Sequence, residues 1–288
     1  MKIKTLLVIF FLTGLPPVAF ADQPVMNEAP RWAGGWGFQV RHLHRSSDTL
    51  LQGDDEVNNP LGLDRRVDTT WLEGVYTFDR SKRVTVKIPW VDQRRTTNVG
   101  GQAVRQHSNG LGDIVVGTPL RKYINYRSWT SNFSLTPNLR LPTGEKSGSY
   151  PISDGSTDLG LSLSYSAESP KWFGSVDFFR WFNLHGRDNQ HQGDESGIDL
   201  TLGTIVYHNG KTSSGAQIQL DMGYRHKDDG FSLAGNNAGD RLMIGPAFNF
   251  FRGPFYFRTV YSFPVYEYAQ EQSVSYGHEW DVGIGVVF

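Results

Sequence analysis

Apolar and polar residues alternate with a period of two along much of this 288-residue chain. In the segment 129–141, large apolar residues and proline fill most odd positions, while threonine, serine, asparagine and arginine fill the positions between them. The same alternation recurs at 157–166, 197–203 and 216–225. Successive side chains of a β-strand point to opposite faces, so each segment predicts a strand with one apolar and one polar face.

Strand-like segments of this kind recur from one end of the chain to the other, separated by turn-forming residues. An even number of antiparallel strands is typical of a closed bacterial barrel, which leaves no strand edge unpaired. The pattern therefore predicts an all-β protein, a closed antiparallel transmembrane β-barrel of 12 strands. The predicted strands are 34–44, 66–78, 84–92, 111–121, 129–141, 157–166, 172–184, 197–207, 215–226, 240–250, 255–266 and 278–288.

The connections between these strands alternate strictly in length. The long ones are 45–65, 93–110, 142–156, 185–196, 227–239 and 267–277, and the short ones are 79–83, 122–128, 167–171, 208–214 and 251–254. Outer-membrane barrels have short periplasmic turns and long extracellular loops. A soluble β-sandwich also produces alternating strands, but it has no reason to keep this parity of connections. The parity therefore predicts a barrel in the bacterial outer membrane.

The last predicted strand, GHEWDVGIGVVF at 277–288, resembles the final strand of bacterial outer-membrane barrels. Its polar face carries Glu279 and Asp281, and its apolar face ends on an aromatic residue. The resemblance implies that the barrel-assembly machinery recognises this strand. The residues expected to form this assembly signal are Trp280, Val282, Ile284, Val286 and Phe288.

Aromatic residues form two levels in the predicted barrel, as the girdles at the two membrane interfaces require. The level near the short connections contains Tyr76, Phe78, Tyr123, Tyr126, Trp129, Tyr165, Trp172, Tyr207, Phe250 and Phe255. The level toward the long connections contains Trp90, Trp181, Tyr224, Tyr266 and Trp280.

The N-terminal segment predicts export. Two lysines precede an apolar run at 6–15, and Ala19, Phe20 and Ala21 form a small-residue cleavage site, so residues 1–21 are predicted to be a cleaved signal peptide. Residues 22–33 are then predicted to form a periplasmic N-terminal segment, a candidate to plug or line the mouth of the barrel, and residues 34–288 are predicted to form the barrel itself. The absence of cysteine excludes a disulfide framework. A net charge of -1 argues against a nucleic-acid partner.

Charged residues occupy the predicted lumen face of many strands. An ion on this face requires water or a partner, because an isolated charge is costly to desolvate. Two interpretations remain open, a hydrated channel or an ion-pair network that fills the bore; both signs occur, so no strong ion selectivity is predicted. The candidate lumen-lining residues are Arg41, Glu73, Asp113, Arg140, Asp158, Asp177, Asp199, Asp221, Arg225, Arg241, Arg258, Glu279 and Asp281.

Candidate catalytic and metal-binding residues are few. His107 and Ser108 resemble the His-x-Ser element of outer-membrane lipid hydrolases, but adjacent residues of a strand face opposite ways. We therefore predict no enzymatic activity and no cofactor. The remaining candidates are interpreted as ordinary rim or loop residues: a protease-like couple at His191 with Asp194, or at His226 with Asp228 and Asp229, a metal pair at His42 and His44, and a cation site at Asp54, Asp55 and Glu56.

Three stretches resemble the proteobacterial outer-membrane transporter family named for the meta-pathway of phenol degradation: GLGDIVVGTPLRKY (110–123), LRLPTGEKSG (139–148) and STDLGLSLSYS (156–166). The resemblance covers roughly residues 105–288. It implies a channel for passive uptake of small aromatic or apolar molecules; the alternative is a barrel that acts as an enzyme on lipid or has a purely structural role. The expected partners are outer-membrane lipid, lipopolysaccharide, the barrel-assembly machinery and a small-molecule solute.

Overall fold

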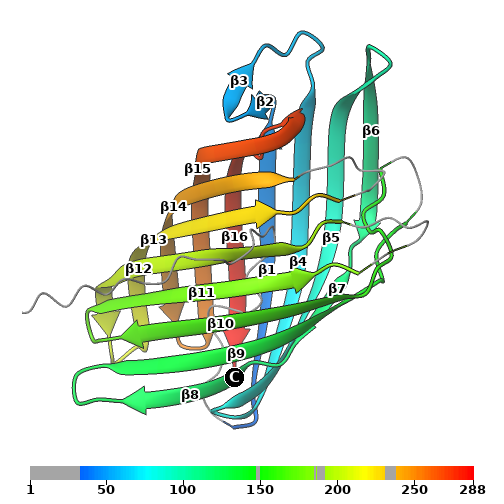
Figure 1. Ribbon diagram of the computed structural model, residues 1–288. Helices are drawn as coiled ribbons and strands as arrows, with labels where there is room; N and C mark the ends of the chain where they lie inside the picture. The colour runs from blue at the N-terminus through cyan, green and yellow to red at the C-terminus, as the bar shows by residue number, and fades with distance from the viewer. Residues whose placement is uncertain (1–32, 147–149, 185, 187–191, 231–237) are drawn as a thin grey trace, which may run out of the picture.

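The computed structural model describes residues 33–146, 150–184, 186, 192–230 and 238–288 (Figure 1). The predicted signal peptide and all but the last residue of the predicted segment 22–33 lie outside the described residues. The described strands join into one antiparallel sheet that closes on itself. In this sheet the first strand pairs with the last, from Gly37 opposite Val287 to Ser46 opposite His278.

Twelve strands in chain order make up the barrel wall, which confirms the predicted fold. One of the twelve is broken into three pieces, β6, β7 and β8, which together pair with β5 on one side, while β7 and β8 pair with β9 on the other. The wall strands are β1 (Gly35–Ser47), β4 (Asp64–Asp79), β5 (Lys82–Val99), β6 (Gln102–Leu111) with β7 (Ile114–Gly117) and β8 (Leu120–Asn125), β9 (Thr130–Leu141), β10 (Asp158–Glu168), β11 (Trp172–Phe182), β12 (Glu195–Asn209), β13 (Ser214–Lys227), β14 (Gly239–Arg252), β15 (Phe255–Val274) and β16 (His278–Val287).

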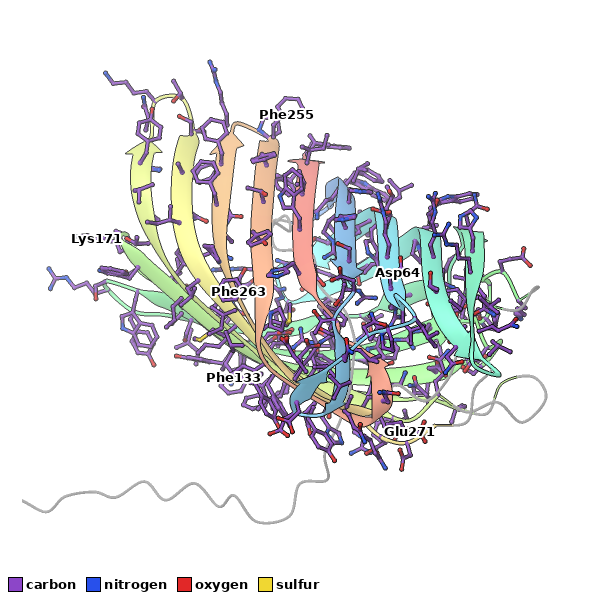
Figure 2. The ribbon with its side chains drawn as sticks, turned by 90° about the horizontal axis from the view of Figure 1, so that it is seen from above. Asp64, Phe133, Lys171, Phe255, Phe263 and Glu271 are labelled. Atoms are coloured by element: carbon purple, nitrogen blue, oxygen red, sulfur yellow. The ribbon has the colours of Figure 1, made fainter. Side chains whose placement is uncertain are left out.

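The side-chain distribution is inverted relative to a water-soluble protein. Large apolar side chains face outward, and Phe133 and Phe255 are 48 % and 65 % exposed on the outside of the wall (Figure 2). Charged and hydroxyl side chains such as Glu73, Arg83 and Thr136 are almost fully buried inside. This is the arrangement expected where lipid surrounds the wall and the lumen is polar. Among the described residues, no helix is long and apolar enough to cross a membrane.

The connections differ between the two ends of the barrel. At one end, five short turns occupy 80–81, 126–129, 169–171, 210–213 and 253–254, as predicted. At the other end, the predicted loop 93–110 is instead a hairpin, in which β5 and β6 pair as far as Val99 and Gln102 around two glycines with positive φ. Strand β15 also runs on to Val274 and pairs with β2 (Leu50–Gly53), which in turn pairs with β3 (Asp55–Val57). The β5–β6 hairpin carries polar residues on both faces, and β2 and β3 are only 4 and 3 residues long, so alternation did not reveal these extensions.

The broken strand has local causes. Gly112 breaks the ladder after β6, and a Cβ atom at this position would lie 2.9 Å from the Pro89 ring. Pro119 has no N–H to donate, which interrupts pairing before β8. The carbonyl of Pro119 still accepts a hydrogen bond from the Arg83 N–H at 3.2 Å, so the wall remains closed here.

Two members of the predicted aromatic levels lie on the inner face of the wall: Tyr123, whose hydroxyl accepts a hydrogen bond from the buried Arg83 at 3.1 Å, and Trp181. Trp181 is only 3 % exposed and faces the lumen, where the guanidinium carbon of Arg140 lies 4.3 Å from its ring centre. The other face of β11 carries Phe178 and Phe182, which are exposed. Aromatic residues occupy both faces of this strand, so the sequence did not distinguish the lipid side from the lumen side.

Candidate functional site

An ion-pair cluster joins the first strands of the barrel to the last. Arg41 on β1 contacts the carboxylates of Glu73, at 3.3 Å, and Asp281, at 2.8 Å. The Lys87 ammonium lies 3.6 Å from the same Glu73 carboxylate, and both cations lie within 6 Å of the Trp71 ring centre. The Glu73 side chain is only 2 % exposed, and these two cations offset the cost of burying a carboxylate away from water.

A second cluster lies on the opposite wall, on strands β11 to β15. Arg225 contacts Asp199 at 2.5 Å, and Arg258 contacts Asp221 at 2.7 Å. Asp221 also accepts a hydrogen bond from Thr201 at 2.7 Å. Asp177 lies directly opposite Asp199 across the β11–β12 pair, so two carboxylates are adjacent here. The two arginines therefore reduce the repulsion among three neighbouring carboxylates, those of Asp177, Asp199 and Asp221.

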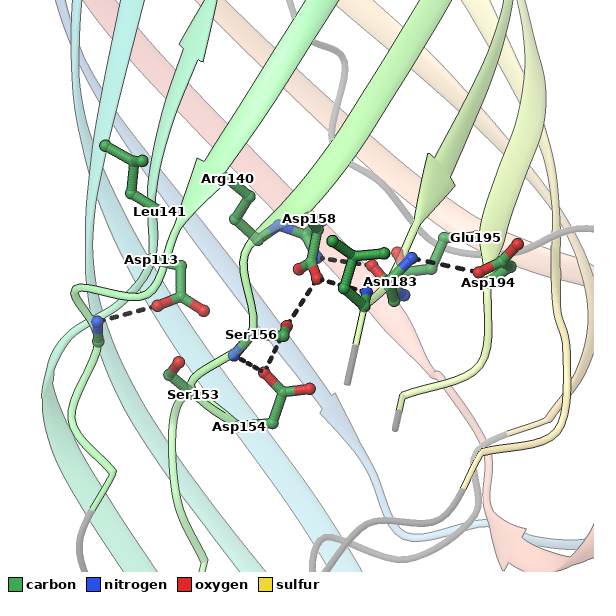
Figure 3. A network of polar contacts seen from close by, with 12 residues as sticks. Asp113, Arg140, Leu141, Ser153, Asp154, Ser156, Asp158, Asn183, Asp194 and Glu195 are labelled. Atoms are coloured by element: carbon green, nitrogen blue, oxygen red, sulfur yellow. Dashed lines mark hydrogen bonds and ion pairs between the residues drawn. The ribbon is translucent and has the colours of Figure 1, made fainter. Parts of the chain in front are cut away.

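The third cluster lies at the long-loop ends of β9 to β12 and contains two more of the predicted acids, Asp113 and Asp158 (Figure 3). Arg140 contacts Asp158 at 3.1 Å and the Asn183 amide oxygen at 3.3 Å. Ser156 donates to Asp158 at 2.6 Å. Asp113, at the break between β6 and β7, accepts the Gly144 N–H at 2.9 Å. These contacts fold the connection between β9 and β10 against the wall.

A cavity of about 510 Å³ occupies the lumen between these clusters. Its lining mixes charged residues with apolar ones such as Leu43, Val67, Met222 and Val260. The predicted residues that line it are Arg41, Asp199, Asp221, Arg225, Arg241, Arg258, Glu279 and Asp281. Of the others, Glu73 lies behind Arg41, Asp177 lies beside Asp199, and Asp113, Arg140 and Asp158 belong to the third cluster.

Several residues of the cavity were missed at the sequence level. Arg45 lies on the same face of β1 as Arg41, and Arg65 lies on the same face of β4 as Glu73. Extending the predicted strands further along the chain would therefore have found both residues. Tyr150 and Tyr276 lie in connections, where strand periodicity gives no signal. Both line the cavity.

His107 and Ser108 do not form a catalytic couple. Ser108 donates to the Tyr150 carbonyl at 2.7 Å, whereas His107 on the opposite face of β6 contacts Asp92 at 3.2 Å. Asp194 contacts Arg180 at 2.9 Å, and His191 lies outside the described residues. His226 contacts Asp240 and Asp228 on the outer side of the wall.

The candidate metal ligands have ordinary partners. His42 contacts the Thr70 hydroxyl at 3.0 Å, and His44 contacts Asp68 at 2.6 Å. Asp55 and Glu56 belong to β3, in the hairpin above the wall, and Asp54 lies in its turn. Within the described part of the chain, no group of three or more His, Cys, Asp or Glu side chains is arranged to hold a metal ion.

The sequence matches the protein-family model described as "Putative MetA-pathway of phenol degradation" over residues 47–277. The chain belongs to this family. The three stretches on which the resemblance rested all contribute residues to the third cluster. No curated protein sequence matches the chain.

Several solved structures have a fold similar to that of this member of the phenol-degradation family. It is similar to the COG4313 outer membrane channel from Pseudomonas putida F1, with a TM-score of 0.70 and 15 % identity, covering 93 % of this chain and 100 % of that one. Lower similarity links it to the β domain of the Bordetella autotransporter BrkA, with a TM-score of 0.47, 12 % identity and coverage of 88 % and 100 %. A Pseudomonas aeruginosa FadL homologue has a TM-score of 0.40, 7 % identity and coverage of 88 % and 90 %. The first of these likenesses identifies the fold as that of an outer-membrane barrel.

Proposed function

We propose that the barrel is a passive outer-membrane channel for small molecules. The observation that carries this proposal is the cavity of about 510 Å³ inside the wall, lined by both ion pairs and apolar side chains. A lumen that served only as a filled core would be expected to be closed by its side chains. Movement through such a cavity needs only a concentration gradient, with no nucleotide or cofactor.

The mixed lining supports solutes that carry both an apolar part and a polar group. Leu43, Val67 and Val260 give the solute apolar contacts, while the paired charges supply hydrogen bonds. The P. putida protein of similar fold is described as a channel, and the family name refers to phenol degradation. We therefore infer that small aromatic molecules are among the solutes.

The absence of cysteine makes a direct test possible. Val260 is 7 % exposed and lines the cavity, so Val260→Cys places a single thiol in the proposed path. In planar bilayers, the purified protein should conduct, and a charged thiol reagent should reduce the current through this variant. The matched control is Tyr261→Cys, because Tyr261 is the next residue and faces outward, 49 % exposed.

Two results would contradict the proposal. If the folded protein shows neither conductance in bilayers nor solute flux in liposomes, it is not a channel. If it conducts and modification of Cys at 260 and at 261 has equal effects, the path does not pass through this cavity. Heat-modifiable mobility on gels establishes that each variant is folded before it is measured.

A further inference from the structure

Four arginines gather at the long-loop end of the lumen: Arg45 on β1, Arg65 on β4, Arg95 on β5 and Arg241 on β14, here called the outer arginine group. Arg65 and Arg95 are directly opposite each other in the β4–β5 pair. Arg45, Arg65 and Arg241 line the cavity, and Arg95 packs on Tyr150, which also lines it. The register, which the sequence alone does not supply, brings these four side chains to one end.

Tyrosine rings position three of the four guanidinium groups. The guanidinium carbons of Arg45 and Arg241 lie 3.8 Å and 3.0 Å from the ring centre of Tyr276. The guanidinium carbon of Arg95 lies 4.1 Å from the ring centre of Tyr150. A guanidinium group stacked on a ring keeps its N–H donors in its own plane, and in that plane the Nε of Arg95 donates to the Gln106 amide oxygen at 2.6 Å.

Two arginines of the group each have a carboxylate directly opposite on a neighbouring strand. Arg45 is opposite Glu279 and Arg241 is opposite Glu267. Both carboxylates also hold the Tyr276 segment, since Glu279 accepts the Tyr276 hydroxyl at 2.9 Å and Glu267 accepts its backbone N–H at 2.7 Å.

No carboxylate faces the other two arginines across the strands. The cross-strand neighbours of Arg65 are Ser47 and Arg95, and those of Arg95 are Arg65 and Gln106. The buried Nε of Arg65 has no hydrogen-bond partner among the described residues. Like charges placed directly opposite destabilise a strand pair, and an anion bound between them would offset that cost.

Apolar side chains adjoin the outer arginine group in the same cavity. Val67 follows Arg65 on the inner face of β4 and lies opposite Arg45 in the β1–β4 pair. Leu43 and Leu51 also line the cavity. A small inorganic anion would leave these surfaces without contact, whereas an apolar body attached to a carboxylate would bury them.

We propose that the outer arginine group is a recognition site for small organic acids, in which guanidinium donors bind a carboxylate and the neighbouring apolar side chains contact its hydrocarbon or aromatic body. Planar carboxylates match the fork of N–H donors on arginine better than neutral hydroxyl groups do. This proposal rests on the channel function proposed above and specifies which solutes the channel favours.

The test compares two double variants that remove equal charge from neighbouring positions. Arg65→Gln with Arg95→Gln removes two lumen charges, whereas Arg66→Gln with Arg94→Gln removes two from the outer face of the same strand pair, where Arg66 is also opposite Arg94. Reversal potentials in a potassium chloride gradient measure the preference for anions. Benzoate and its neutral analogue benzyl alcohol, added on the long-loop side, measure recognition of the carboxylate.

The sequence predicted no strong ion selectivity, but the register places Arg65 directly opposite Arg95, so the wild-type channel is expected to favour chloride over potassium. Benzoate is expected to interrupt its current more than benzyl alcohol does. The lumen double variant should lose both properties, and the outer-face double variant should keep them. Arg65→Lys with Arg95→Lys should keep the chloride preference and lose part of the benzoate effect, because lysine lacks the planar fork.

The outcomes separate this proposal from the channel function. A protein that conducts but treats benzoate and benzyl alcohol alike would overturn the organic-acid site and leave the channel intact. Equal losses in the lumen and outer-face variants would overturn it as well, since the effect would then be one of overall charge. A folded protein that does not conduct would overturn the channel function first.

Discussion

Gly144 donates its backbone N–H to the carboxylate of Asp113 at 2.9 Å, and this bond joins two motifs that are 31 residues apart. Asp113 closes the GLGD element and Gly144 closes the LPTG element. There is no room for a larger residue at 144, because a Cβ atom there would lie 2.7 Å from the Ser153 Cβ and 3.0 Å from the Asp113 carboxylate. The GLGD and LPTG elements thus hold the β9–β10 connection against the interrupted strand.

Replacing Asp113 with alanine should loosen this connection. The change leaves the Gly144 N–H without its acceptor, and losing a partner for a buried donor costs about 1–3 kcal/mol. We expect heat-modifiable mobility to be lost at a lower urea concentration than in the wild type. We also expect the single-channel current to be noisier. Glu56→Gln, on the exposed hairpin strand β3, serves as the control and should change neither. Unchanged stability and current noise in Asp113→Ala would show that the motif contact does not restrain the connection.

Replacing Glu73 with glutamine should destabilise the barrel strongly. Arg41 and Lys87 both approach this carboxylate, and the change leaves two buried cations with less compensation. Removing one partner from a buried ion pair costs about 3–5 kcal/mol. The comparison variant is Asp92→Asn, which breaks a pair with Arg94 on the exposed face and should cost about 1 kcal/mol or less. If both variants lowered the urea midpoint by the same amount, water in the lumen would be screening the charges of the Glu73 cluster.

The alternation of apolar and polar residues was sufficient to predict the strands of the wall, but not to predict which side chains meet in the lumen. A period of two assigns each residue to a face, so the twelve strands and the outward position of Trp280 were predictable. Which charges meet depends on register across strands far apart in the chain, and Arg41 and Asp281 are 240 residues apart. Trp181 was misplaced because both faces of β11 are aromatic, and Tyr150 and Tyr276 were missed because connections carry no periodic signal.

The stability of the long-loop end should fall at alkaline pH through Tyr276, which lies between β15 and β16. Burial raises the pKa of this phenol above its ordinary value of 10.0; Arg241 and Arg45 oppose the shift and Glu279 adds to it. The unfolded chain therefore releases this proton at a lower pH than the folded one. The stabilisation is fully present below pH 10 and is lost as the pH rises through the folded pKa.

Tyr276→Phe tests this dependence. The wild-type urea midpoint should fall above pH 10, and the fall should be smaller in the variant, which has no phenol to ionise. Tyr261→Phe, on the lipid side of β15, should behave as wild type. The same steepness of alkaline loss in all three proteins would exclude Tyr276 as its source.

Phe288 should matter more for assembly than for the stability of the finished barrel. Its backbone exchanges two hydrogen bonds with Trp36, at 2.7 Å and 2.8 Å, and substitution of the side chain does not remove them. The ring itself is 60 % exposed and touches the wall through Phe38, with ring centres 6.1 Å apart. We therefore expect Phe288→Ala to lower the yield of heat-modifiable protein in outer membranes several-fold. The free energy of unfolding of the purified, refolded barrel should stay within about 1 kcal/mol of wild type.

Phe255→Ala is the matched control, because Phe255 is 65 % exposed at the same end of the barrel but lies outside the last strand. Equal yields from the two variants would mean that Phe288 contributes only apolar surface and is not part of an assembly signal.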